Sequence, residues 1–332
     1  MRFGLLVAFT AFLVLPLATS AQSFGGLGNT SGDAFTLSVS PQYPSPYGQA
    51  SVSLVSDSLD LAGATVTVTV AGKETYKGTV RAFSVPLGKA GSVTNVKVSV
   101  SSGGALYSQT LSLQPQDVVL VAEPLSSAPP LYLGKPSVPL EGEVRVVAMA
   151  SLRDAGGKTS SPMTYSYAWT VDGVRLANSS GIGKSALIVA SPLQYRTREV
   201  SVVVKNASGT LVGGTSLSFS AVEPSVRLYE NDPLLGIRYD RTLFGSYAIA
   251  RAEATLYAAP FSLPTTGGTP LVQWFLNGSP AQVGNSITLR PTGSGRGEAL
   301  LSLTASGGGS ATALASLSLI FGATSGTNFF GL

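Results

Sequence analysis

The chain contains the stretch Tyr165-Ser-Tyr-Ala-Trp-Thr-Val-Asp-Gly173 and, further on, the related stretch Gln273-Trp-Phe-Leu-Asn-Gly278. In each, a Trp lies in an apolar segment that ends at an Asp-Gly or Asn-Gly pair. Such pairs favour tight hairpin turns, because glycine accepts a positive φ. A Trp just before the turn is expected to fill the space between two packed sheets. The two stretches therefore predict two equivalent β-sandwiches with Trp169 and Trp274 in their cores.

The Trp stretches belong to a longer internal repeat, because three further matches follow them in the same order. These are Gly183-Lys-Ser-Ala-Leu-Ile188 with Gly284-Asn-Ser-Ile-Thr-Leu289, Asn206-Ala-Ser-Gly209 with Thr304-Ala-Ser-Gly307, and Ser216-Leu-Ser-Phe219 with Ser316-Leu-Ser-Leu319. A looser third copy contains Val68-Thr-Val-Ala-Gly72, with Val68 in the place of the Trp. Repetition at a fixed period indicates repeated structural units. We therefore expect three similar domains.

Strand patterns dominate the body of the chain. Apolar and polar residues alternate strictly at Thr65–Val70 and Val96–Val100, and similar patterns rich in apolar residues occur at Val144–Val147, Val200–Val204 and Ala299–Leu303. This alternation, bounded by Gly, Pro, Asn and Ser, is typical of half-buried antiparallel strands. No stretch has the pattern of a helix of three turns. The fold class expected is all-β, with tandem antiparallel sandwiches.

The first residues have the layout of a secretory signal peptide. Met1–Ala21 combines Arg2, an apolar run and small residues before Gln22, which is the order found in cleaved leaders. The alternative is an uncleaved membrane anchor, although the apolar run is short for a span of ~20 residues. We expect residues 1–21 to be removed and the mature chain to begin near Gln22. Residues 22–33 form a flexible Gly- and Ser-rich leader in this interpretation.

Two similar segments predict where one domain gives way to the next. Val121-Ala-Glu-Pro124 and Ala221-Val-Glu-Pro224 lie 100 residues apart. A Pro after a terminal strand cannot donate to a ladder, so it suits a short linker. The expected domains are 34–121, a diverged copy, then 122–222 and 223–322, followed by a tail at 323–332.

The composition excludes several classes of function. Only 11% of the residues are charged, the net charge is +4, and Lys and Arg form no cluster. A nucleic-acid partner needs a concentrated basic face, so none is expected. Histidine and cysteine are both absent, which removes a Ser-His-Asp triad, imidazole and thiolate metal ligands, and disulfides. We expect a protein that is not an enzyme.

The remaining motifs assign no catalytic, cofactor-binding or metal-binding residue. Gly157-Lys158-Thr159 and Gly183-Lys184-Ser185 lack the earlier glycine of a phosphate-binding loop and are interpreted as turns. Glu141 with Glu143 is interpreted as solvated surface. The densest group of oxygen ligands contains Glu230, Asp232 and Asp240. Calcium binds such groups at domain junctions, but a turn without metal is preferred, and no cofactor is expected.

The two Trp stretches resemble the strand-and-turn segment of bacterial immunoglobulin-like and PKD-like domains. In that family an aromatic residue precedes a buried Trp, and an Asp-Gly or Asn-Gly turn ends the strand. The fuller PKD pattern, Trp-Asp-Phe-Gly-Asp-Gly, is absent. The resemblance implies tandem immunoglobulin-like sandwiches and a role in surface display, adhesion or spacing.

The function expected is that of a secreted or cell-surface structural or adhesive protein, found outside the cell or at its surface. Its partners would be other envelope or surface proteins, or glycans. Contact with a membrane would require an uncleaved N-terminal segment. One alternative is a carbohydrate- or protein-binding accessory module of a secretion or envelope system, with Tyr43, Tyr47 and Tyr195 available to stack on sugars. Another is an outer-membrane β-barrel, which the threefold repeat disfavours.

Overall fold

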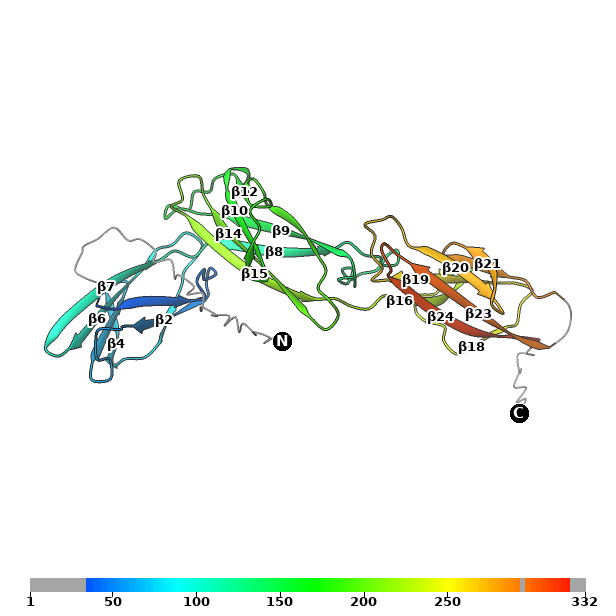
Figure 1. Ribbon diagram of the computed structural model, residues 1–332, viewed down its shortest axis with the longest axis horizontal. Helices are drawn as coiled ribbons and strands as arrows, with labels where there is room; N and C mark the ends of the chain where they lie inside the picture. Colours follow the sequence, from blue (N-terminus) through cyan, green and yellow to red (C-terminus); the bar gives the residue numbers. More distant parts are fainter. Residues whose placement is uncertain (1–33, 293–295, 323–332) are drawn as a thin grey trace, which may run out of the picture.

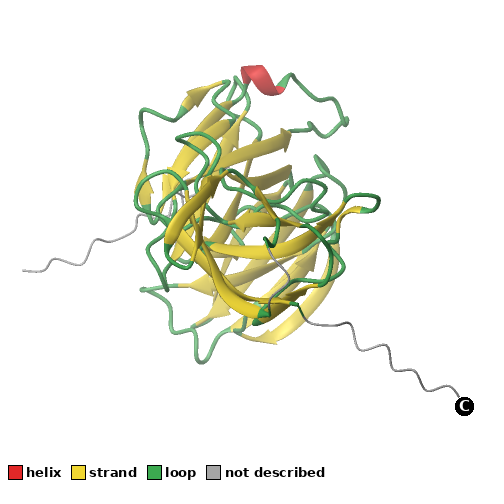
Figure 2. Cartoon of the chain, turned by 90° about the vertical axis from the view of Figure 1, so that its right-hand side faces the viewer, coloured by secondary structure: helices red, strands yellow, loops and turns green. Residues whose placement is uncertain are grey.

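The computed structural model describes residues 34–292 and 296–322. These residues form three β-sandwiches that follow one another along an extended molecule (Figure 1). Almost all regular structure is strand, and the one helix of the described residues is the short 3-10 turn Pro162–Thr164 (Figure 2). The expected signal peptide, leader and tail lie outside the described residues.

The first sandwich consists of a three-stranded and a four-stranded sheet. The smaller sheet has the order β1 (Thr36–Ser40), β2 (Gln49–Val55), β5 (Phe83–Pro86). The larger has the order β4 (Lys73–Thr79), β3 (Thr65–Val70), β6 (Thr94–Ser102), β7 (Ala105–Leu113). Alternate residues of both sheets point inward and form one apolar core.

The second sandwich repeats this strand order. Its smaller sheet runs β13 (Ala186–Ala190), β9 (Glu143–Ser151), β8 (Asp117–Pro124). Its larger sheet runs β11 (Val174–Arg175), β10 (Ser166–Val171), β14 (Thr197–Lys205), β15 (Val212–Ser220), with β12 (Gly181–Ile182) also on β10. Because both sandwiches connect equivalent strands in the same order, they are two copies of one fold.

The third sandwich keeps this plan and adds strands to it. Its smaller sheet runs β17 (Gly236–Ile237), β16 (Ser225–Asp232), β19 (Ala254–Phe261), β22 (Ser286–Leu289). Its larger sheet runs β18 (Ser246–Ile249), β24 (Thr312–Phe321), β23 (Gly297–Ser306), β20 (Leu271–Leu276), β21 (Ser279–Val283). β18 pairs in parallel with β24, while the other ladders are antiparallel. The architecture is therefore a tandem array of immunoglobulin-like β-sandwiches, as the sequence predicted.

The repeat in the sequence corresponds to equivalent core positions. Val68, Trp169 and Trp274 are fully buried on β3, β10 and β20. Each lies opposite a buried residue of the neighbouring long strand: Val98, Val202 or Leu303. The Trp169 and Trp274 indole N–H groups donate to the Lys184 and Gly284 carbonyls at 2.9 and 2.7 Å. The assignment of both Trp residues to sandwich cores is confirmed.

The turn that follows each of these positions is also the same. Ala71-Gly72, Asp172-Gly173 and Asn277-Gly278 have φ values of 48° to 50° at the first residue and 80° to 82° at the glycine. Both residues are left-handed, as a type I′ hairpin turn requires. In the later copies, the Asp172 and Asn277 side chains accept from the Glu199 and Leu300 amides at 2.9 and 2.8 Å. The turn residues thus also tie the hairpin to the next strand.

The first domain boundary differs from the expected position. Residues 117–124 form β8, and Val121 pairs with Val147 of the second sandwich. The expected boundary between residues 121 and 122 therefore falls inside a strand, and residues 114–116 connect the first two sandwiches. Pro124 ends β8, a position where its missing N–H is tolerated, so a strand end resembled a linker. Residues 221–224 connect the second and third sandwiches.

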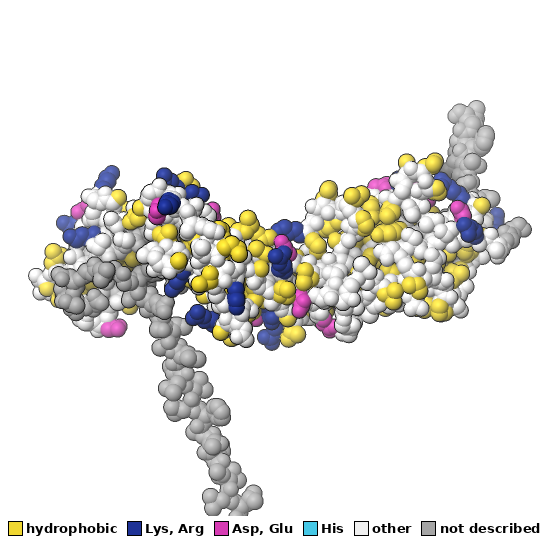
Figure 3. All heavy atoms as spheres, turned by 90° about the horizontal axis from the view of Figure 1, so that it is seen from above, with side chains coloured by type: hydrophobic (Ala, Val, Ile, Leu, Met, Phe, Trp, Pro, Cys, Tyr) yellow, Lys and Arg dark blue, Asp and Glu magenta, His cyan; other side chains and the backbone are white. Residues whose placement is uncertain are grey.

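The surface carries few charges. Lys, Arg, Asp and Glu are dispersed over the face seen in Figure 3, among many uncharged polar and apolar side chains. In the part of the chain that the structure describes, no helix is long and apolar enough to cross a membrane. The partly apolar segment Thr312–Phe321 forms the strand β24.

Candidate functional site

The joints between the sandwiches hold the buried polar side chains of the described residues. These side chains are Gln116, Ser126, Ser127 and Ser262. A buried polar group is stable only when it is hydrogen-bonded. Gln116 lies at the first joint and the three serines at the second, so both joints are specific contacts that fix neighbouring sandwiches to each other.

The first joint is closed by reciprocal hydrogen bonds between side chain and backbone. The Gln116 side-chain amide donates to the Arg153 carbonyl at 3.0 Å, and the Arg153 amide donates to the Gln116 side-chain oxygen at 2.7 Å. On the side of the first sandwich, Gly91 donates to the Pro115 carbonyl at 2.8 Å and accepts from the Gln114 side chain at 3.0 Å. The connector is thus bonded to both of its neighbours.

Two glycines allow the first two sandwiches to approach closely. A Cβ atom on Gly91 would lie 2.4 Å from the Asp154 carbonyl oxygen, on the other side of the joint. A Cβ atom on Gly214 of β15 would lie 2.6 Å from the ring of Tyr43. Burial raises the pKa of the Tyr43 hydroxyl. The first joint therefore depends on glycine at both contact points.

The second joint is a short strand-like exchange between two loops. Ser127 donates its amide to the Leu263 carbonyl at 2.8 Å and accepts from the Ser262 amide at 3.0 Å. The Thr265 amide donates to the Leu125 carbonyl at 3.0 Å, and the Leu263 amide donates to the Ser127 hydroxyl at 3.1 Å. Both loops thus satisfy their buried backbone groups across the joint, as paired strands do.

Side chains extend the second joint beyond this exchange. The Tyr132 ring meets the Phe261 ring edge-on at 5.7 Å, and the Arg227 guanidinium lies 5.4 Å from the centre of the same Phe261 ring. The Ser310 hydroxyl hydrogen-bonds Glu141. The Tyr132 and Glu141 contacts cross the joint, whereas Arg227 packs on Phe261 within the third sandwich.

The carboxylates considered for calcium are each paired with a different arginine. Glu230 lies 3.6 Å from Arg241, and Asp240 forms a two-bond pair with Arg238 at 2.9 Å. Asp232 accepts from the Leu234 and Leu235 amides, which lower its pKa, and Arg251 lowers it further. Among residues 34–292 and 296–322, no group of three or more acidic, His or Cys side chains converges on a metal site.

Chelation is therefore expected to leave the fold unchanged. The melting temperatures in excess EDTA and in millimolar calcium should agree, because an ion that bound only the native state would raise the melting temperature. Differential scanning calorimetry measures this directly. A calcium-dependent rise that Asp232→Asn abolishes would contradict the arginine-paired interpretation.

The other residues considered from sequence do not meet in one site. Tyr47 and Tyr195 are both exposed. The Tyr47 amide donates to the Gly88 carbonyl, near the first joint. Tyr195 lies in the loop after Ser191, whose amide donates to the Gly142 carbonyl near the second joint. They do not form one sugar-stacking platform.

The motifs with lysine and the paired glutamates have local structural roles. Gly157 and Lys158 lie in a turn closed by Asp154, and Lys184 donates to the Asn178 carbonyl at 2.6 Å. Glu141 contacts Ser310 at the second joint, while Glu143 begins β9. Sequence reasoning did not find the joints, because serine and glycine are common throughout the chain and nothing local distinguishes Ser127 or Gly91.

Comparison with known proteins gives distant structural matches only. No family model and no curated protein matches the chain. Three N-terminal domains of the bacteriophage RB49 highly immunogenic outer capsid protein align over 87% of this chain and 99% of that structure, at 12% identity and a TM-score of 0.26. The central fibronectin-III array of RIM-binding protein aligns over 86% and 95%, at 10% identity and 0.26. Sidekick-1 immunoglobulin domains 1–4 align over 87% and 74%, at 12% identity and 0.21. The fold described above rests on strand order and register.

Proposed function

We propose that the chain is an exported structural or adhesive protein, a stiff spacer that holds binding surfaces at a set distance from its point of attachment. The observation that carries this proposal is the construction of the two joints. At the first joint the connector is bonded to both sandwiches, through Pro115 to Gly91 and through Gln116 to Arg153. At the second joint Ser127 is bonded directly across to the loop that contains Leu263. Opening such a joint would exchange these hydrogen bonds for bonds to water, at a net cost of ~0.5–1.5 kcal/mol for each bond.

The proposal assigns no catalytic activity to the chain. The sequence has no histidine and no cysteine, and the clustered carboxylates of the third sandwich are held by arginines. The protein would act by presenting surfaces to other envelope or surface proteins, or to glycans.

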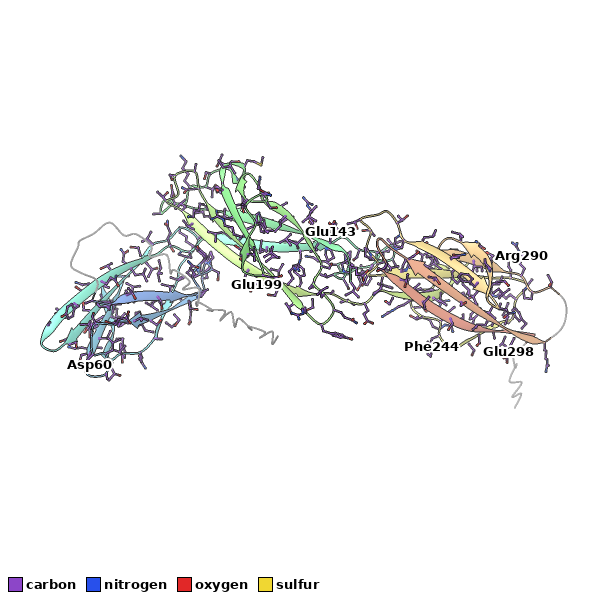
Figure 4. All side chains as sticks on the ribbon, viewed as in Figure 1. Asp60, Glu143, Glu199, Phe244, Arg290 and Glu298 are labelled. Carbon is purple, nitrogen blue, oxygen red and sulfur yellow. The ribbon has the colours of Figure 1, made fainter. Side chains whose placement is uncertain are left out.

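Distances between spin labels test the stiffness. The chain has no cysteine, so spin labels attach only at introduced cysteines. The pair Lys77→Cys with Glu199→Cys spans the first joint, and the pair Glu199→Cys with Glu298→Cys spans the second. Figure 4 shows Glu199 and Glu298 on their separate sandwiches. Double electron-electron resonance should give one narrow distance distribution for each pair. Broad distributions for both pairs, beside a narrow one for two labels within one sandwich, would show a flexible string of domains and refute the spacer.

The intact mass of the exported protein tests whether residues 1–21 are removed. If residues 1–21 are a signal peptide, the intact mass of material recovered outside the cell should correspond to a chain that begins at Gln22. A mass that retains Met1–Ala21 would instead support a membrane anchor.

A further inference from the structure

The outer face of the smaller sheet differs among the three sandwiches in its side chains and in what covers it. The outer face of the smaller sheet in the first sandwich is covered with hydroxyl and amide side chains. Ser38 and Ser53 hydrogen-bond across it at 2.7 Å, and Ser84 donates to Gln49 at 2.7 Å. Polar side chains of this face thus hydrogen-bond one another.

The third sandwich has an apolar face here and covers it with its own chain. Tyr229, Tyr257 and Ala259 are buried on the outer side of β16 and β19. The segment 233–243 folds over them, since β17 pairs with β16 and Tyr239 meets the rings of Tyr229 and Tyr257 edge-on at 5.2 and 6.4 Å. Aromatic side chains on an added segment thus seal this face.

The second sandwich has an apolar face in the same place and leaves it bare. The side chains on this face of β8, β9 and β13 include Val119, Val121, Val147, Met149, Ala186 and Ile188. Val121, Val147 and Ala186 form one row across the three strands, and Val119 lies opposite Met149. Val119, Met149 and Ile188 are 51%, 63% and 57% exposed. We call this surface the β9 face.

The reason that the β9 face is bare lies in the connection between its strands. In the third sandwich, the segment between β16 and β19 returns over the sheet. In the second sandwich, the corresponding segment, residues 125–142, makes the second joint instead. A contiguous cluster of exposed apolar side chains on one sheet face is a feature of interaction sites. The next row toward this joint contains the Glu123–Arg145 ion pair, at 3.0 Å, with Ile188 beside Arg145.

We propose that residues 323–332 of a second copy of this chain dock on the β9 face. This segment, Ala-Thr-Ser-Gly-Thr-Asn-Phe-Phe-Gly-Leu, contains no charged residue and carries Phe329, Phe330 and Leu332. It would supply to the second sandwich what residues 233–243 supply to the third, namely aromatic side chains on an extended segment. The uncharged segment also suits the two rows Val119–Met149 and Val121–Val147–Ala186, which carry no charge.

The segment of the same copy is too short to reach this face. β24 begins near the second joint, where Ser310 meets Glu141, and ends at Phe321 at the far end of the third sandwich (Figure 1). Its ten residues span ~30 Å, and Val147 lies a further ~13 Å along β9 from Glu143. Ten extended residues reach at most ~35 Å. The contact therefore links two copies head to tail, and such a contact can continue from copy to copy.

Sedimentation of the mature full-length chain tests the assembly. The weight-average mass should rise with concentration through about 100 μM, a range in which weak specific contacts are seen. A face variant, Met149→Ser with Ile188→Thr, and a tail variant, Phe329→Ser with Phe330→Ser, should each remain monomeric. The control Leu106→Ser removes a side chain that is 73% exposed on the first sandwich and should associate as the parent does. Unchanged melting temperatures show that the variants are folded.

Mixing the two variants gives the decisive result. The tail variant keeps an intact face and the face variant keeps an intact tail, so an equimolar mixture should form a 1:1 pair of twice the monomer mass. A chain that stays monomeric at all concentrations overturns the proposal. A tail variant that still associates would show that two β9 faces pair directly, and a face variant that still associates would place the segment elsewhere. Both results contradict the assignment.

Discussion

Replacement of Trp274 by Ala is expected to lower the free energy of unfolding of the third sandwich by ~3–5 kcal/mol. The side chain is fully buried in the core between the two sheets, so its removal leaves a cavity that the surrounding strands cannot close. The Gly284 carbonyl also loses the indole N–H that donates to it at 2.7 Å. Trp169→Ala should have an effect of the same size on the second sandwich, because Trp169 is equally buried there.

The two Trp residues make the measurement selective. They are the only Trp residues of the chain, so in each variant the remaining Trp reports one sandwich by its fluorescence during urea unfolding. In Trp274→Ala, the transition seen by Trp169 should not move, while circular dichroism shows an earlier transition for the third sandwich. Trp274→Phe keeps most of the side-chain volume but removes the indole N–H. It should therefore lower the free energy of unfolding of the third sandwich by less than Trp274→Ala does. Native emission typical of a water-exposed indole would contradict the core assignment.

Replacement of Gly91 by Ala is expected to open the first joint without unfolding either sandwich. The new Cβ would lie 2.4 Å from the Asp154 carbonyl oxygen and 2.8 Å from Arg153. These atoms belong to the second sandwich, so the clash is relieved most easily when the two sandwiches move apart. Spin labels at Lys77→Cys and Glu199→Cys should then show a broad distance distribution in place of a narrow one.

Gly72→Ala is the matched control for this change. Gly72 has a φ of 82° and Gly91 a φ of 84°, so both replacements place Ala in the same left-handed conformation, at a cost of ~1–2 kcal/mol. A Cβ atom on Gly72 meets nothing within 4 Å. Gly72→Ala should therefore leave the label distances unchanged. Equal broadening in both variants would trace the effect to backbone strain, and no broadening with Gly91→Ala would mean that the joint is not the rigid element.

The sequence by itself determined the repeated sandwich. Period-two alternation depends only on which face of a strand each residue occupies, so Thr65–Val70 was placed correctly and coincides with β3. The Asp172-Gly173 and Asn277-Gly278 turns follow from the conformational freedom of glycine and the small polar residue before it. The equivalence of Trp169 and Trp274 followed from their matching surroundings in the repeat.

The tertiary structure alone decided how the sandwiches are joined and which faces stay open. The Leu263 amide meets the Ser127 hydroxyl across 136 residues of sequence, and neither residue type marks a joint by itself. Residues 125–142, which follow β8, could cover their own sheet, as residues 233–243 do in the third sandwich, or they could reach the next domain. The sequence of this segment does not distinguish the two arrangements. Local preference selects strands and turns, whereas joints and open faces depend on which distant surfaces bury each other's unpaired groups.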